Sequence, residues 1–172
     1  MPEKNDVIRI ATCACGQVEL EGWGPPIIHV ECYCDDCQEG GRRIEALPNA
    51  PSPRGPLGGT DFLLYRKDRL RVSRGESLLS GFKLKDASAT KRLVATCCNS
   101  GMFMDMGPGP HWFSVYRNRF TGEVPPLALR TCTRYKPAGV ELPNDVPNHA
   151  SFLSVRFMTK LFLAWLPMLM KR

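Results

Sequence analysis

The stretch Cys32-Tyr33-Cys34-Asp35-Asp36-Cys37 places three thiols within six residues, in the spacing C-x-C-x-x-C. A thiolate is a soft ligand, and zinc binds thiolates in tetrahedral geometry. With this spacing, one short turn of backbone can direct three sulfur atoms towards a single point. Three protein ligands leave a fourth coordination position open, as in catalytic zinc sites. The stretch therefore predicts a zinc site at Cys32, Cys34 and Cys37.

Two other interpretations of these thiols remain open from the sequence. A fourth cysteine from elsewhere in the chain makes the site a closed, structural zinc centre. Cys34 and Cys37 also form a C-x-x-C pair, which is typical of thioredoxin-like redox dithiols. A redox pair forms a reversible disulfide, so this interpretation predicts oxidisable thiols in place of bound zinc.

Length and composition indicate one globular domain in a reducing compartment. The chain has 172 residues, of which 43% are hydrophobic, so it can bury a sizeable core. Residues 1–6 are polar and no apolar stretch follows them, so we expect a cytoplasmic protein without a signal peptide. There the 8 cysteines stay free of disulfides, which favours metal binding. The net charge of +6 is mild, and we expect no nucleic-acid binding because aromatic residues are not interleaved with basic clusters.

Short alternating or β-branched segments predict a mainly β protein. The expected strands are residues 7–12, 17–21, 27–30, 61–65, 69–73, 78–84, 91–96, 102–106 and 112–116. Three of these segments lead directly into thiols. Cys13 and Cys15 follow the first, the cluster at residues 32–37 follows the third, and Cys97 and Cys98 follow segment 91–96. Strand ends that repeatedly present thiols predict two metal sites built on a β scaffold.

Other parts of the chain carry weaker signals. Residues 48–59 are rich in proline and glycine and predict a loop, either functional or a tolerated insertion. Residues 122–148 are expected to be irregular, and Cys132 within them receives no role because a lone cysteine is usually a small buried residue. His29 and His111 are interpreted as structural histidines.

The last stretch, residues 151–170, is the only helix that the sequence predicts. Ser151 is the expected N-cap, and apolar residues fall on two stripes. The uncharged run is too short to span a bilayer, which needs about 20 apolar residues. We therefore divide the chain into a zinc-binding β domain at residues 1–150 and an amphipathic helix at residues 151–172. The helix is expected to pack on the domain or on a second subunit, or to lie on a membrane surface with Arg156, Lys160, Lys171 and Arg172 at the headgroups.

The order of the thiol groups resembles that of the family of glutathione-dependent formaldehyde-activating enzymes and centromere protein V. The resemblance runs from Cys13 to Gly101 and comprises C-x-C-G, then C-x-C-x-x-C, then a cysteine pair followed by glycine. It implies a β-tent of antiparallel sheets with zinc knuckles. It also implies that Cys13, Cys15 and Cys97 bind a structural zinc, and that the thiols of residues 32–37 bind a second zinc with an open position for glutathione sulfur.

The chain departs from the family pattern in its last thiol group. That group is usually C-x-x-C-G, whereas this chain has Cys97-Cys98-Asn99-Ser100-Gly101, with Ser100 in place of the second cysteine. A serine hydroxyl is a poor zinc ligand at neutral pH, so we expect Cys98 to complete the site, with water as the alternative. This Cys-Cys-Asn form resembles an uncharacterised bacterial branch of the family.

The function expected from the resemblance is a zinc-dependent carbon–sulfur lyase acting on a thiol adduct such as S-hydroxymethylglutathione. Its cofactor is one or two zinc ions per chain, and glutathione is the expected co-substrate. The alternative is a non-enzymatic zinc-binding module that docks a partner or a membrane through the C-terminal helix. The departure at Ser100 and the apolar tail favour this alternative.

Overall fold

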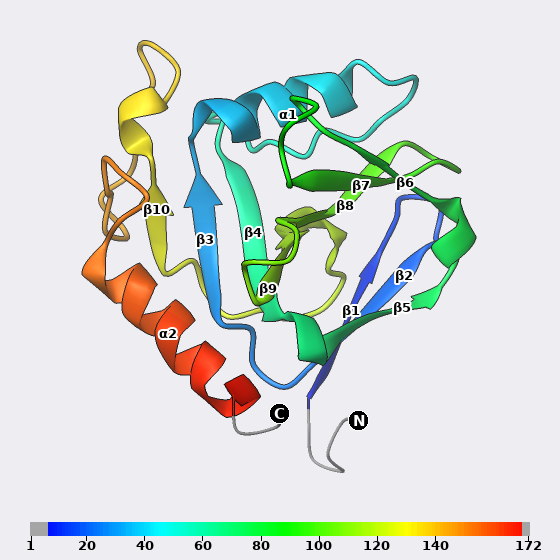
Figure 1. Cartoon of the computed structure of the whole chain (residues 1–172). Helices are drawn as coiled ribbons and strands as arrows, with labels where there is room; N and C mark the ends of the chain where they lie inside the picture. Colours follow the sequence, from blue (N-terminus) through cyan, green and yellow to red (C-terminus); the bar gives the residue numbers. More distant parts are fainter. Residues whose placement is uncertain (1–6, 170–172) are drawn as a thin grey trace.

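The computed structural model, which describes residues 7–169, is mainly β (Figure 1). Its ten strands form two sheets, and the chain ends in a helix, so the predicted fold class is confirmed. Residues 1–6, on which the prediction of no signal peptide rests, and residues 170–172, at the end of the predicted helix, lie outside the described residues. No helix in the described part of the chain is long and apolar enough to cross a membrane.

The larger sheet has seven strands in the order β10-β3-β4-β9-β8-β7-β6. These are β3 (Ile28–Cys32), β4 (Thr60–Arg66), β6 (Leu79–Phe82), β7 (Lys91–Ala95), β8 (Ser100–Asp105), β9 (Trp112–Tyr116) and β10 (Leu129–Thr131). Neighbouring strands are antiparallel except β10, which pairs parallel to β3. The smaller sheet is antiparallel and consists of β1 (Ile8–Thr12), β2 (Glu19–Trp23) and β5 (Leu70–Arg74).

Strand β4 is buried on both faces because the core lies on both sides of the larger sheet. Phe62 and Leu64 belong to a core cluster that also contains side chains of the two helices. Leu63 and Tyr65, which point to the opposite face, belong to a second cluster shared with the smaller sheet. The two-sided burial explains why residues 61–65 form a continuous apolar run in the sequence.

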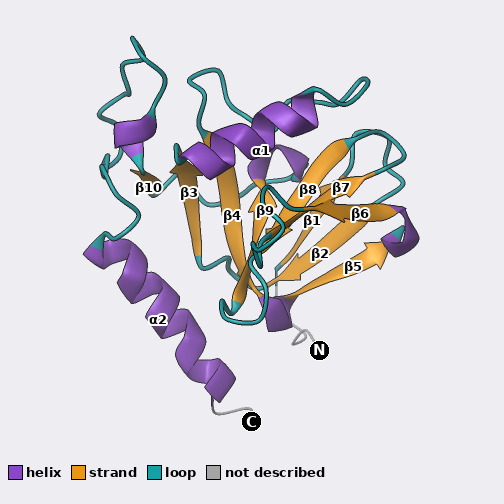
Figure 2. Ribbon diagram, turned by 45° about the horizontal axis from the view of Figure 1, so that its top comes forward, coloured by secondary structure: helices purple, strands orange, loops and turns teal. Residues whose placement is uncertain are grey.

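The sequence does not predict the helix α1 (Asp35–Glu45). It starts inside the cysteine cluster at residues 32–37, called the knuckle below, and crosses one end of the larger sheet (Figure 2). Cys34 is its N-cap, and its sulfur accepts a hydrogen bond from the Cys37 backbone N–H at 3.3 Å. The prediction of a single helix is therefore wrong. The buried face of α1 is formed by Cys37, Gly40, Gly41 and Ile44, and two glycines disfavour a helix by intrinsic propensity.

The C-terminal helix α2 (Val155–Leu169) lies beside the β10 and β3 side of the larger sheet (Figures 1 and 2). It begins at Val155 and not at Ser151, because Ser154 supplies the cap by accepting a hydrogen bond from the Phe157 N–H at 3.3 Å. One stripe packs on the domain through Phe157 and Leu161, which are buried. The region predicted to be irregular, residues 122–148, contributes strand β10.

Candidate metal centres

The first candidate centre joins the turn after β1 to the turn between β7 and β8. The sulfur atoms of Cys13, Cys15, Cys97 and Cys98 all lie within 4.8 Å of one another. Antiparallel pairing of β7 with β8 places the second thiol pair in a tight turn. The structure therefore brings together two thiol groups that are more than eighty residues apart in the chain.

The sulfur spacing of this centre fits tetrahedral zinc. A zinc–sulfur bond of about 2.3 Å in a tetrahedron requires sulfur atoms about 3.8 Å apart. The observed Sγ–Sγ distances are 3.6 Å between Cys13 and Cys15, 3.8 Å between Cys13 and Cys97, 3.3 Å between Cys15 and Cys97, and 3.9 Å between Cys97 and Cys98. Four thiols at these distances can hold one metal ion in a closed tetrahedral site.

Ser100 lies beside this centre and supports it. Its side chain is fully buried, and its Oγ accepts hydrogen bonds from the Ala14 N–H at 3.0 Å and from Arg119 at 3.2 Å. The same oxygen lies 3.1 Å from the Cys98 sulfur. Burial opposes ionisation of Cys98, but hydrogen bonds from Ser100 and from the backbone outweigh it and lower the pKa of this thiol to about 6. Ser100 thus favours the thiolate of Cys98.

The second candidate centre is the knuckle at the end of β3. The sulfur atoms of Cys32, Cys34 and Cys37 lie within 4.8 Å of one another. Cys32 ends the strand, Cys34 caps α1, and Cys37 lies in the first turn of that helix. Cys32 and Cys37 are buried, whereas Cys34 is partly exposed. The strand-to-helix turn therefore directs three thiols to one point, as the spacing predicts.

The ionisation of the knuckle thiols shows why this donor set suits a cation. Cys132 opposes ionisation of Cys32, but the thiols of Cys34 and Cys37 together lower the pKa of Cys32. Cys32 in turn raises the pKa of Cys34 to about 11 and also raises the pKa of Cys37. Three thiolates this close repel one another, so all three can be ionised together only around a cation. A zinc ion meets this need, since it binds thiolates.

Cys132 is a residue near this centre that the sequence analysis set aside. It follows β10, whose Thr131 pairs with Cys32, and its buried thiol interacts with the Cys32 thiol. Its sulfur is not among the three mutually close sulfur atoms of the knuckle. The parallel pairing of β10 with β3 brings this cysteine to the site, and no local sequence pattern predicts that pairing.

A cavity of about 250 Å³ opens beside the second centre. Cys32, Cys34, Cys37 and Cys132 are among the residues that line it. The rest of the lining is mostly apolar and includes Val30, Phe62, Leu64, Met104, Met106, Trp112, Phe152 and Phe157. The last two come from the C-terminal segment, so that segment helps to close the cavity in addition to packing on the domain.

Arg92, on β7, is a buried cation in the lining of this cavity. Its guanidinium lies over α1, where Nη2 donates a hydrogen bond to the Asp36 carbonyl oxygen at 2.6 Å. Gly40 makes this approach possible, because a Cβ at that position would lie 2.1 Å from Arg92 Nε. The sequence gives no sign of this contact, which depends on the packing of α1 against the sheet.

The two histidines considered in the sequence lie away from the metal-site geometry. His29 is held between the Pro125 carbonyl oxygen at 2.7 Å and the Asp61 carboxylate at 2.9 Å. Burial lowers the pKa of His111, whose ring packs edge-on against Trp112. Neither is in a group of mutually close metal-ligand atoms in residues 7–169.

Comparisons with known proteins do not assign a family. No family model matches the chain. No curated protein matches it either. A crystal structure of a Rhodobacter sphaeroides protein, solved as a structural genomics target, aligns with 22% identity and a TM-score of 0.48, covering 67% of this chain and 91% of that one. Function therefore has to be argued from the site.

Proposed function

We propose that this chain is a zinc-dependent lyase that makes or breaks the carbon–sulfur bond between a thiol and an aldehyde. The observation that supports the proposal is that three mutually close thiols line a mostly apolar cavity. The same proposal places the chain in the family of glutathione-dependent formaldehyde-activating enzymes and centromere protein V. A model substrate is S-hydroxymethylglutathione, the adduct of glutathione and formaldehyde.

In this proposal the two centres have different roles. Cys13, Cys15, Cys97 and Cys98 hold a structural zinc, because four thiols complete its coordination. Cys32, Cys34 and Cys37 hold a second zinc, which, when bound, favours the thiolate form of a substrate thiol. Three thiolate ligands donate much charge, so orientation of the substrate contributes more here than Lewis acidity.

The residues of the chain contribute binding and exclusion of water. Trp112, Phe152 and Phe157 shield the cavity beside the knuckle, so an aldehyde and a thiol meet away from bulk solvent. In the forward direction a bond forms between the thiol sulfur and the carbonyl carbon, and the thiol proton ends on the carbonyl oxygen. The reverse reaction breaks this bond and returns the proton to sulfur, so no oxidant or reductant is consumed.

The direct test is exchange between free formaldehyde and its glutathione adduct, followed by NMR with zinc-loaded protein. We expect exchange above the spontaneous rate, and loss of the acceleration in Cys34→Ser. A matched control is Cys132→Ser, which we expect to retain zinc because its sulfur lies outside the close group. If exchange with wild-type protein proceeds only at the spontaneous rate, for this adduct and for those of other small thiols, the enzyme proposal is rejected. The chain would then be a non-enzymatic zinc-binding module.

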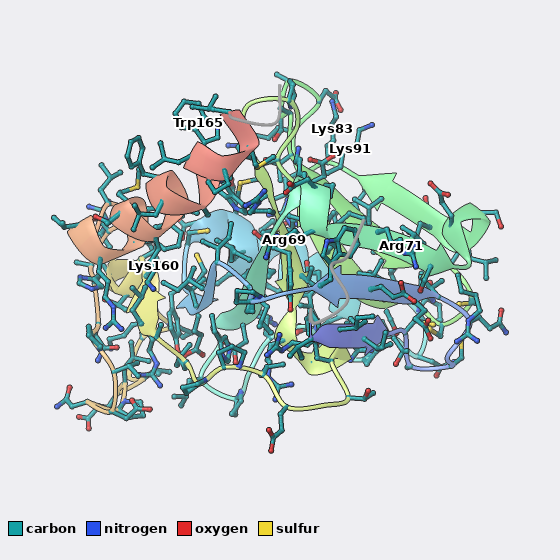
Figure 3. The ribbon with its side chains drawn as sticks, turned by 90° about the horizontal axis from the view of Figure 1, so that it is seen from below. Arg69, Arg71, Lys83, Lys91, Lys160 and Trp165 are labelled. Carbon is teal, nitrogen blue, oxygen red and sulfur yellow. The ribbon has the colours of Figure 1, made fainter. Side chains whose placement is uncertain are left out.

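A second candidate function, docking to an anionic membrane surface, is favoured by the exposed face of α2. The apolar stripe that does not pack on the domain consists of Val155, Met158, Phe162, Leu163, Trp165, Leu166 and Leu169, all exposed. Figure 3 shows Trp165 and Lys160 on opposite sides of the helix. Residues 151–172 contain no Asp or Glu, so charge complementarity favours anionic lipid.

Flotation with phosphatidylserine-containing vesicles tests this second function. We expect binding that weakens with salt and that is lost when Phe162 and Leu166 are both changed to Ser. Val7→Ser removes another exposed apolar side chain, far from α2 in sequence, and should leave binding intact. Failure to float would reject docking to the membrane. A dimer in sedimentation that depends on Phe162 and Leu166 would show instead that this face binds a second copy of the chain.

A further inference from the structure

We propose that the cavity beside Cys32, Cys34 and Cys37 selects a thiol with an apolar body and a single carboxylate, and that Arg92 holds the carboxylate. This inference rests on the proposed function, because it names the class of thiol that reaches the knuckle. It also assigns a binding residue, Arg92, that lies outside both cysteine groups.

The buried positive charge of Arg92 is the first observation that supports this inference. The residue is 3% exposed, its Nε has no hydrogen-bond partner, and among residues 7–169 it forms no ion pair. Its one hydrogen bond, from Nη2, goes to a backbone carbonyl oxygen. Two other buried arginines have a carboxylate partner: Arg66 bonds Asp68 at 2.5 Å and Arg130 bonds Glu31 at 2.8 Å. Glu39 acts on Arg92 only through space, so the buried guanidinium has no carboxylate in direct contact. A ligand anion in the adjoining cavity offsets the cost of burying that charge.

Trp112 supplies a second donor in the same lining. Its side chain is nine-tenths buried, and its indole N–H has no hydrogen-bond partner in the described part of the chain. An indole N–H and a guanidinium N–H both donate, and a carboxylate only accepts. Arg92 and Trp112 therefore bring donors to one cavity from β7 and β9, which lie on either side of β8 in the larger sheet.

The remaining lining determines the body of the ligand. Phe62, Leu64 and Met104 present hydrocarbon to the same cavity, so an alkyl or aryl group gains by burial there. Glutathione carries two carboxylates, an ammonium group and two amides. The cavity lining contains one cation, and the one acidic residue in it, Asp36, is exposed. Polar groups buried without partners lose affinity, so glutathione is a poor fit.

Calorimetric titration of zinc-loaded protein with four probes tests this selectivity. The probes are 6-mercaptohexanoate, 6-mercaptohexanol, hexanoate and glutathione. We expect 6-mercaptohexanoate to bind about tenfold or more tightly than 6-mercaptohexanol and than glutathione, because a hydrogen bond between charged groups contributes at least about a factor of ten to affinity. Arg92→Met should reduce its affinity to that of 6-mercaptohexanol and leave the 6-mercaptohexanol affinity unchanged.

Controls separate failure of this inference from failure of the proposed function. Zinc content and circular dichroism establish that Arg92→Met is folded, and Arg92→Lys, which keeps the charge, should retain part of the preference for the carboxylate. Hexanoate lacks a thiol, so its Arg92-dependent binding tests the cavity alone. If 6-mercaptohexanoate binds no more tightly than hexanoate, the proposal that zinc binds the thiol fails, while the carboxylate site at Arg92 is still supported. Tightest binding of glutathione, or no effect of Arg92→Met, would overturn the inference.

Discussion

Replacing Gly40 by alanine tests the packing of α1 against Arg92. The new Cβ would lie 2.1 Å from Arg92 Nε and 2.7 Å from its Cδ, so the guanidinium has to leave its position. Moving it breaks the hydrogen bond to the Asp36 carbonyl oxygen, at a cost of roughly 1.5–3 kcal/mol for a charged donor. Alanine in a helix interior recovers about 0.5–1 kcal/mol relative to glycine. The net expectation is a loss of about 1–2 kcal/mol in the free energy of unfolding.

A double-mutant cycle isolates this contact. In an Arg92→Ala background the obstructing side chain is gone, so Gly40→Ala should stabilise the protein by about 0.5–1 kcal/mol. The effect of the same substitution therefore changes sign between the two backgrounds, with a coupling of about 2 kcal/mol. The assay is urea unfolding at a fixed excess of zinc, because bound metal contributes to stability. An effect of equal sign and size in both backgrounds would refute the packing argument.

Four further predictions concern the metal centres. Cys13→Ser should lower the melting temperature more than Cys34→Ser, because structural zinc supplies folding free energy; equal melting would reject the division into structural and substrate-binding centres. Ser100→Ala should lower the free energy of unfolding by about 1–3 kcal/mol, because the buried Arg119 and the Ala14 N–H lose the oxygen that accepts their hydrogen bonds. The zinc content should stay the same; a lower zinc content would show that Ser100 is a ligand. X-ray absorption should find four sulfur neighbours at about 2.3 Å for the first centre, with one lost in Cys98→Ser. Zinc affinity should decrease as the pH falls, because protons compete for the thiolates; affinity that rises in acid would exclude thiolate ligation.

The fold and the cysteine groups were predictable because their signals are local. Alternation of apolar residues predicted most strands, and the spacings at residues 13–15, 32–37 and 97–98 marked the sulfur groups. Helix α1 was missed because the small residues Gly40 and Gly41 carry its buried face, and glycine does not contribute to an apolar periodicity.

The parts of the site that escaped prediction depend on long-range pairing. Cys132 reaches Cys32 only through the parallel pairing of a three-residue strand, β10. Arg92 lies between the exposed Lys91 and the partly buried Leu93 in β7, and nothing local distinguishes it from a solvent-facing arginine. Contacts between strands and helices distant in sequence placed both residues, so only the three-dimensional structure reveals them.

Elemental analysis of protein purified without chelators shows whether two zinc centres organise this chain. We expect about two zinc ions per chain, falling to about one in Cys34→Ser with the fold retained. Protein that is folded, with all thiols free and without zinc, would contradict it.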